Sequence, residues 1–127
     1  MSVPRHAKNN VFIGYDFRED DAYNVCKHTL YTKSPLLDTI VHKLDHKWLR
    51  SNNYFFREWH IDQNGQYWDK SDNRPFSTEF SHSRFLVPYL AKDLGFDGWV
   101  LYCDCDFMFR TPVEKLFEQV RQSSFLY

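Results

Sequence analysis

Long hydrophobic runs and an excess of one charge are both missing from this 127-residue chain. No apolar run approaches the roughly 20 residues that a membrane-spanning helix needs. Residues 1–10 include basic residues but no apolar stretch follows them, so no secretion signal is predicted. The net charge of −1 excludes the strong basic field of a nucleic-acid-binding protein. We therefore expect a cytoplasmic protein whose partners are neither nucleic acids nor membranes.

Cysteine is also scarce, with three residues in the whole chain. Cys103 and Cys105 stand two residues apart on one predicted strand, where they are poorly placed to bridge each other. Together with Cys26 they are too few for a disulfide framework. We expect three reduced thiols in the core, and the alternative is a zinc site completed by scattered histidines.

Glycine is rare as well, and its four occurrences form neither a phosphate loop nor a dinucleotide-binding fingerprint. Hydrophobic residues make up 43% of the chain, and a chain of this length buries roughly two thirds of its unfolded surface. We expect one domain over residues 11–127, preceded by a polar leader over residues 1–10. There are no repeats or low-complexity segments.

The most informative stretch is residues 99–110, an apolar and aromatic run that predicts a buried strand ending in two acids. Side chains alternate along a strand, so Asp104 and Asp106 are expected on one face. Two neighbouring carboxylates repel each other unless a cation lies between them, and a hard divalent ion suits oxygen ligands. The alternative is a solvated turn.

A second strand is predicted at residues 11–16, followed directly by a helix. Asp16 can cap this helix, with Glu19 completing a capping box. Positions typical of one helical face follow, namely Ala22, Val25, Cys26, Thr29 and Leu30. The turn of Gly14, Tyr15 and Asp16 is either a binding edge or an ordinary strand-to-helix loop.

A third strand is predicted at residues 38–45, and a hairpin follows it. The hairpin arms are residues 54–59 and 66–68, around the turn dipeptide Asn64-Gly65. Its aromatic side chains cover either the core or a ligand.

The pattern of residues 77–94 predicts one long helix with an apolar stripe on which Arg84 falls. Pro88 cannot donate the bond that would close on the carbonyl of Arg84, so the helix should loosen there. A guanidinium on an apolar face needs an anionic partner. Arg84 therefore reaches the two acids or their substrate, unless it extends to solvent instead.

A final helix is predicted from Thr111-Pro112 through Val120. The order strand, helix, strand, insert, helix, strand, helix is typical of a doubly wound α/β domain with a mostly parallel sheet and flanking helices.

Four segments resemble the nucleotide-sugar half of a GT-A-fold glycosyltransferase and are most similar to glycosyltransferase family 8. They are residues 11–16, 83–88, 101–106 and 113–117. The resemblance covers about residues 10 to 120. It implies a GT-A, Rossmann-like domain that ends after the DxD strand and one following helix.

The resemblance also implies an enzyme that transfers a sugar from a nucleoside diphosphate donor, with a UDP-sugar expected, to an unknown acceptor. Asp104 and Asp106 would be the DxD motif that holds Mn²⁺ or Mg²⁺ against the diphosphate. Gly14, Tyr15 and Asp16 would border the base and ribose. Arg84 matches an arginine that contacts the donor sugar and the acids.

This chain departs from that family because only 127 − 106 = 21 residues follow Asp106. In that family a region well beyond the DxD motif supplies a metal-binding histidine and much of the acceptor site, so we expect either a fragment of a longer enzyme or a shortened protein that binds donor and relies on a partner. A non-catalytic module that binds donor or a partner is therefore an alternative, and exposed apolar surface should then favour self-association. A minor alternative is a phosphatase with Asp104 as nucleophile and Asp106 as acid.

Overall fold

A computed structural model describes residues 9–34 and 38–122 of the chain. Its elements, in order, are β1 (Asn9–Gly14), η1 (Phe17–Glu19), α1 (Asp20–Lys33), β2 (Thr39–Leu44), α2 (His46–Ser51), β3 (Trp59–Ile61), β4 (Tyr67–Asp69), β5 (Arg74–Phe76), α3 (Phe80–Ser83), η2 (Arg84–Leu86), α4 (Val87–Asp93), β6 (Val100–Cys103) and α5 (Glu114–Gln122).

The main sheet has three parallel strands in the order β2-β1-β6. In its register, Phe12 of β1 lies opposite His42 of β2 and Tyr102 of β6. Strand β1 is buried along its whole length, which its central position requires. The predicted α/β class, with a parallel sheet and flanking helices, is confirmed.

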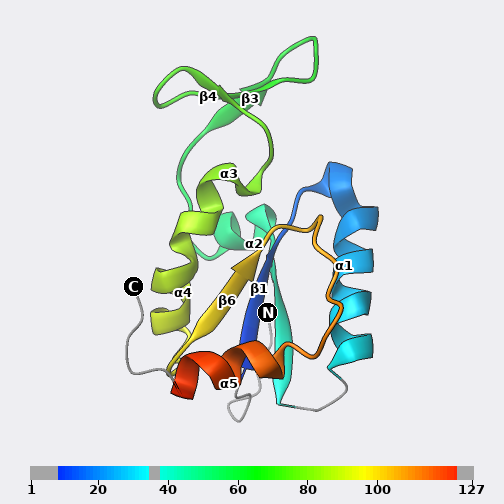
Figure 1. Cartoon of the computed structure of the whole chain (residues 1–127). Helices are drawn as coiled ribbons and strands as arrows, with labels where there is room; N and C mark the ends of the chain where they lie inside the picture. The colour runs from blue at the N-terminus through cyan, green and yellow to red at the C-terminus, as the bar shows by residue number, and fades with distance from the viewer. Residues whose placement is uncertain (1–8, 35–37, 123–127) are drawn as a thin grey trace.

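Helices cover both faces of this sheet. Alternate residues of β1 point to opposite faces, and both sets of side chains are buried. Val11 and Ile13 pack with α1 and α5 in one core, and Phe12 packs with α2 and α4 in the other. Figure 1 shows α1 and α4 on opposite sides of the strands. All three cysteines are buried free thiols, as predicted.

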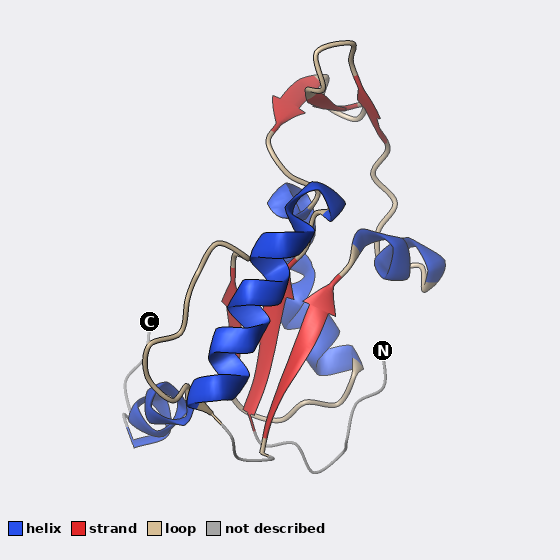
Figure 2. Cartoon of the chain, turned by 90° about the vertical axis from the view of Figure 1, so that its right-hand side faces the viewer, coloured by secondary structure: helices blue, strands red, loops and turns tan. Residues whose placement is uncertain are grey.

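A small antiparallel sheet of β3, β4 and β5 stands beyond the carboxyl ends of the main strands (Figure 2). The predicted turn at Asn64-Gly65 is confirmed, since Gly65 adopts a φ of 79° and Asp62 accepts backbone bonds from Asn64 and Gln66. The first arm is shifted, however, to Trp59–Ile61 from the predicted residues 54–59. The third strand, β5, was not predicted.

The long helix predicted at residues 77–94 is broken into α3, η2 and α4. The break lies at Arg84–Leu86, one turn before Pro88, as the missing proline donor predicted. Gly95 ends α4 with a φ of 80°. Most of the predicted stripe is buried, including Phe80, Val87 and Leu90.

Two details of the structure differ from the predictions: where the first strand begins, and which side chain of α1 is buried. Asn9 and Asn10, assigned to the leader, belong to β1, whereas the rest of the predicted leader lies outside the described residues. Val25 was expected on the buried face of α1 but is 49% exposed, and Tyr23 is buried instead. Among the described helices, none is both long and apolar enough to span a membrane.

Candidate functional site at the carboxyl edge of the sheet

The three parallel strands end at one edge, where Tyr15, Asp45 and Asp104 follow β1, β2 and β6. The chain leaves β1 toward β2 through α1 and later returns to the other side of β1 through α4. Strand β1 is therefore the point at which the topology switches direction. In open α/β sheets, ligands bind at the carboxyl edge beside such a point.

The acid pair follows β6 but does not continue it. The predicted strand over residues 99–106 ends at Cys103, and Cys105 and Asp106 form a turn. The alternation that was expected to place both acids on one strand face therefore stops before them. Asp104 is half-buried and Asp106 is exposed.

Asp104 is held by its neighbour on the strand. The Tyr102 hydroxyl donates a 2.8 Å hydrogen bond to Oδ1 of Asp104. Burial raises the pKa of Tyr102 far above its ordinary value, and the hydrogen bond to Asp104 raises it further, so the phenol stays a proton donor.

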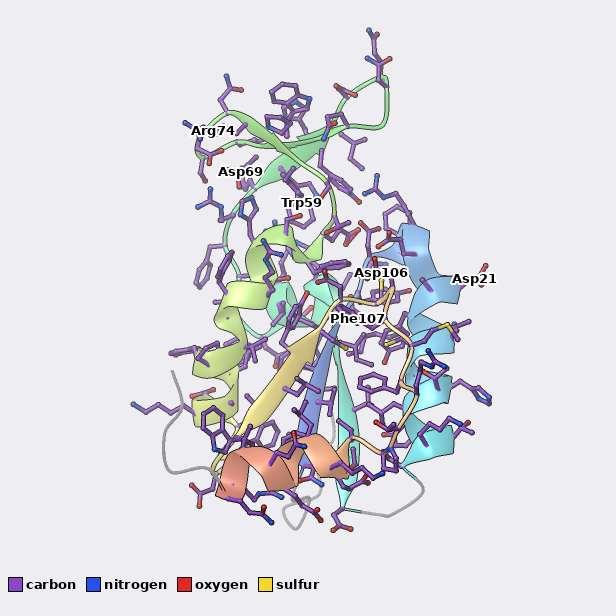
Figure 3. The ribbon with its side chains drawn as sticks, in the orientation of Figure 1. Asp21, Trp59, Asp69, Arg74, Asp106 and Phe107 are labelled. Carbon is purple, nitrogen blue, oxygen red and sulfur yellow. The ribbon has the colours of Figure 1, made fainter. Side chains whose placement is uncertain are left out.

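The charge of Asp106 affects Cys105, which packs in the core on the α1 side of the sheet. Burial raises the pKa of Cys105 to about 12, and the negative charges of Glu19 and Asp106 contribute to this rise. The Cys105 thiol also donates a 3.4 Å bond to Glu19. Figure 3 shows Asp106 and Phe107 on the loop that leaves β6, well below Trp59 of the hairpin sheet.

Gly14 is buried at the end of β1, beneath two aromatic rings. A Cβ atom at this position would lie 2.6 Å from the Tyr102 hydroxyl and 2.8 Å from Cγ of Phe80. Gly14 therefore allows the Tyr102 hydroxyl to lie close to β1, and this hydroxyl is the one that hydrogen-bonds Asp104. It is not one of the residues that line the cavity of about 490 Å³ described below.

Asp16 is fully buried, and both of its oxygens are used within the protein. Oδ1 accepts from the backbone and Nε of Arg18, while Oδ2 accepts from Nη2 of Arg18 and the backbone of Glu79. Burial alone would raise the pKa of Asp16, but these bonds hold it below its ordinary value. Asp16 thus joins the β1 turn to the start of α3.

A cavity of about 490 Å³ lies at the ends of β1 and β2, between the main sheet and the hairpin sheet. Its size is in the range of small-molecule sites. The hairpin supplies an aromatic and aliphatic wall, the β1 turn supplies Tyr15, and the polar groups are two lysines, two acids and a histidine. The lining residues are Tyr15, Phe17, Lys43, Asp45, His46, Lys47, Trp59, Ile61, Tyr67 and Glu79.

Of the residues predicted to border a nucleotide, Tyr15 lines this cavity, whereas Gly14 and Asp16 do not; Asp16 is linked to it through the backbone of Glu79. Sequence reasoning missed Lys43, Lys47, Asp45 and Glu79. The position of Lys43 and Asp45 at the end of a predicted parallel strand was an available signal. Glu79 carried none, because its neighbours in the cavity come from a distant hairpin.

Arg84 is exposed, which agrees with the alternative that its side chain extends to solvent. The tighter 3₁₀ winding of η2 changes the angular position of its side chains. Within the described part of the chain, no ion pair joins Arg84 to Asp104 or Asp106, and its guanidinium lies 5.1 Å from the Phe85 ring centre. Its charge nevertheless opposes the rise in the pKa of Tyr102, which places it toward the Asp104 side of the edge.

Together, the fold and this edge define an α/β domain with a cavity of small-molecule size at the carboxyl ends of its parallel strands. The chain is 37% identical over 108 residues to Protein CDI of Arabidopsis thaliana. The alignment covers 84% of this chain but only 34% of Protein CDI, so the chain spans about one third of that relative. No protein-family model and no solved structure matches the chain.

Proposed function

We propose that this chain is the donor-binding part of a metal-dependent glycosyltransferase of the GT-A type, similar to family 8, with a UDP-sugar as donor. The observation that carries the proposal is the placement of an acid pair and a mixed polar and aromatic cavity along one sheet edge. The acids follow β6 and the cavity lies over β1 and β2. Two strand spacings amount to about 10 Å, which a nucleoside diphosphate can bridge.

The cavity chemistry supports a nucleotide ligand. Trp59 and Tyr15 line the cavity with half-buried aromatic rings, which suit contact with a planar base. Lys43 and Lys47 supply positive charge for phosphate oxygens. In this arrangement the nucleoside occupies the cavity and the diphosphate extends toward Asp104.

The acid pair offers the type of ligand atom that this proposal requires. Asp104 and Asp106 offer carboxylate oxygens, the ligand type that Mn²⁺ and Mg²⁺ prefer. Among residues 9–34 and 38–122, no group of three or more His, Cys, Asp or Glu side chains gathers in a metal-binding arrangement. An ion held by two acids would thus take its other ligands from phosphate oxygens and water, and would neutralise charge on the departing diphosphate.

The chain's own residues then orient the donor. Tyr102 keeps Oδ1 of Asp104 fixed by its hydrogen bond, which directs the carboxylate toward the sheet edge. Arg84, exposed on the same side, is free of an acidic partner among the described residues and can meet the donor sugar or its phosphates. Arg84→Ala should therefore weaken donor binding while changing stability by less than about 0.5 kcal/mol.

Isothermal titration calorimetry with UDP, in the presence and absence of Mn²⁺, tests the proposal. We expect the chain to bind UDP in a Mn²⁺-dependent way and Asp106→Asn to weaken this binding at least about tenfold, because a charged ligand is lost. Asp97→Asn, an exposed acid before β6, is the matched control and should bind like the unaltered chain. Mn²⁺-dependent binding that Asp106→Asn leaves unchanged would count against the proposal.

A second candidate is a non-catalytic module of the same fold that binds the donor or a partner without transferring the sugar. It is favoured by one observation, an apolar groove of about 230 Å³ beside the outer edge of β6. In that case a sugar-transfer assay with UDP-[¹⁴C]glucose and related donors shows no product and no donor hydrolysis, although calorimetry shows binding.

A further inference from the structure

Two acids line the cavity, and Glu79 is the one whose backbone and side chain the protein holds in place by hydrogen bonds. It begins the segment leading into α3, and its backbone N–H donates a 3.0 Å bond to the buried carboxylate of Asp16. Arg18 fixes that carboxylate and also donates a 2.8 Å bond to the backbone oxygen of Ser77. The main chain around Glu79 is therefore held on both sides.

The side chain of Glu79 is held as well, but only through one of its oxygens. The Tyr67 hydroxyl donates a 3.0 Å hydrogen bond to Oε2. Oε1 accepts no hydrogen bond from any described residue. A carboxylate that lines a cavity with one oxygen engaged and one open is ready to accept a bond from a ligand.

The electrostatic surroundings of Glu79 favour a ligand that donates hydrogen bonds. Burial raises the pKa of this carboxyl above its ordinary value, and the negative charges of Asp16 and Asp45 add to the rise, while Tyr67 and Arg18 oppose it. The ionised form accepts one side-chain hydrogen bond from the described residues, the one that Tyr67 donates. A ligand hydroxyl or N–H would supply one.

We infer that Glu79 binds the ribose of the donor. Its Oε1 accepts a hydrogen bond from the 2′- or 3′-hydroxyl of the nucleotide. This inference rests on the nucleotide-binding function proposed above. Two neighbouring hydroxyls offer two donors to a carboxylate. The single ring N–H of uracil lies between two carbonyl oxygens, which a carboxylate repels, so the base is the poorer partner.

Asp45, the other cavity acid, is less suited to this role. Its Oδ1 accepts the backbone N–H of Lys47 and caps α2. In addition, it lies between Lys43 and Lys47 in the sequence, and both lysines line the same cavity. The competing hypothesis is that Asp45, in the same cavity, binds the ribose instead of Glu79.

The test compares the affinities of UDP, 2′-deoxy-UDP and 3′-deoxy-UDP for the full chain with Mn²⁺, measured by calorimetry. We expect UDP to bind about tenfold more tightly than at least one deoxy analogue, as one hydrogen bond to a charged group predicts. In Glu79→Gln this ratio should fall to about threefold, because a neutral acceptor makes a bond roughly half as strong. The exposed hairpin residue Glu58 supplies the control Glu58→Gln, which should keep the full ratio.

The ratio is a readout that a purely structural role of Glu79 does not change. The assignment of Glu79 is overturned if Glu79→Gln lowers the affinity for all three ligands equally. It is also overturned if the affinity ratio between UDP and the deoxy analogues falls in Asp45→Asn instead. Equal affinity of the unaltered chain for all three ligands overturns it as well, while the donor-binding function stands. Failure of UDP itself to bind, with or without Mn²⁺, overturns the proposed function and this inference together.

Discussion

The hydroxyl of Tyr102 donates a 2.8 Å hydrogen bond to Oδ1 of Asp104, two residues further along the chain. Tyr102 belongs to β6 and its ring packs with the core on the α4 side of the sheet. The orientation of an acid at the sheet edge is thus coupled to packing inside the domain. The predictions below follow from this and three other features of the described structure.

Tyr102→Phe removes the donor to Asp104 and keeps the ring. We expect Mn²⁺-dependent UDP binding to weaken about five- to tenfold because the carboxylate is no longer held, whereas stability should fall by only about 1 kcal/mol. Calorimetry and urea unfolding measure the two effects. Tyr89→Phe, an exposed tyrosine on α4, is the control. Unchanged UDP affinity in Tyr102→Phe would show that Asp104 needs no such support.

Gly14→Ala introduces a methyl group where no space exists, since its Cβ would lie within 3 Å of both Tyr102 and Phe80. We expect a loss of about 1–3 kcal/mol in the free energy of unfolding, the range typical of overpacking. The double variant Gly14→Ala with Phe80→Ala should lose less stability than the sum of the two single variants, because removing Cγ of Phe80 relieves one of the two clashes. A single variant as stable as the unaltered chain contradicts the predicted clash.

Acid should destabilise the fold through two buried histidines. Burial lowers the pKa of His42 and of His46 to about 4, from an ordinary value of 6.5, and Arg50 adds to the effect at His46. The unfolded chain therefore binds more protons between pH 4 and 6.5, and stability must rise with pH across that window. Each histidine contributes at most about 3 kcal/mol to this change.

Urea unfolding at pH 4.5, 5.5 and 7 measures this dependence. His42→Asn should be less stable at pH 7 but should lose less stability on acidification than the unaltered chain. His28→Gln, an exposed residue of α1, should leave the slope unchanged. A flat profile between pH 4.5 and 6.5 would mean that neither histidine is buried as a neutral ring.

The apolar groove beside β6 should promote self-association. Trp99 and Leu116 on its rim are 44% and 45% exposed, and β6 has one strand neighbour, β1, in the described sheet. Exposed apolar surface next to an open strand edge favours contact between copies. Sedimentation velocity should show dimers that increase with concentration and decrease in Leu116→Lys, but not in Lys115→Glu. A monomer at the highest soluble concentration would be the opposite result.

Much of the main sheet was predictable because its local patterns agree with the tertiary environment. The apolar run at residues 11–14 is strong enough to mark a central strand, and Gly95 and Pro88 mark a helix end and a helix break. The predicted turn at Asn64-Gly65 depends on the left-handed conformation that glycine adopts without strain. Prediction of β5 failed because three residues, one of them proline, carry almost no strand signal.

The candidate site was predicted only in part. The acids at residues 104 and 106 and the turn at residues 14–16 were found, since each follows an apolar strand directly. Their geometry was not, because β6 ends three residues earlier than its pattern suggests and Arg84 turns outward in a 3₁₀ segment. The roles proposed for these residues stay predictions until binding is measured.

The sequence by itself determined which segments are central strands and where chemistry-bearing residues follow them, because alternation, capping and turn residues are local properties. Tertiary structure decided what those residues face. Glu79 meets Tyr67 from a hairpin twelve residues away and Asp16 from a turn 63 residues away. Such contacts depend on how separate elements pack, and no pattern within one segment encodes them.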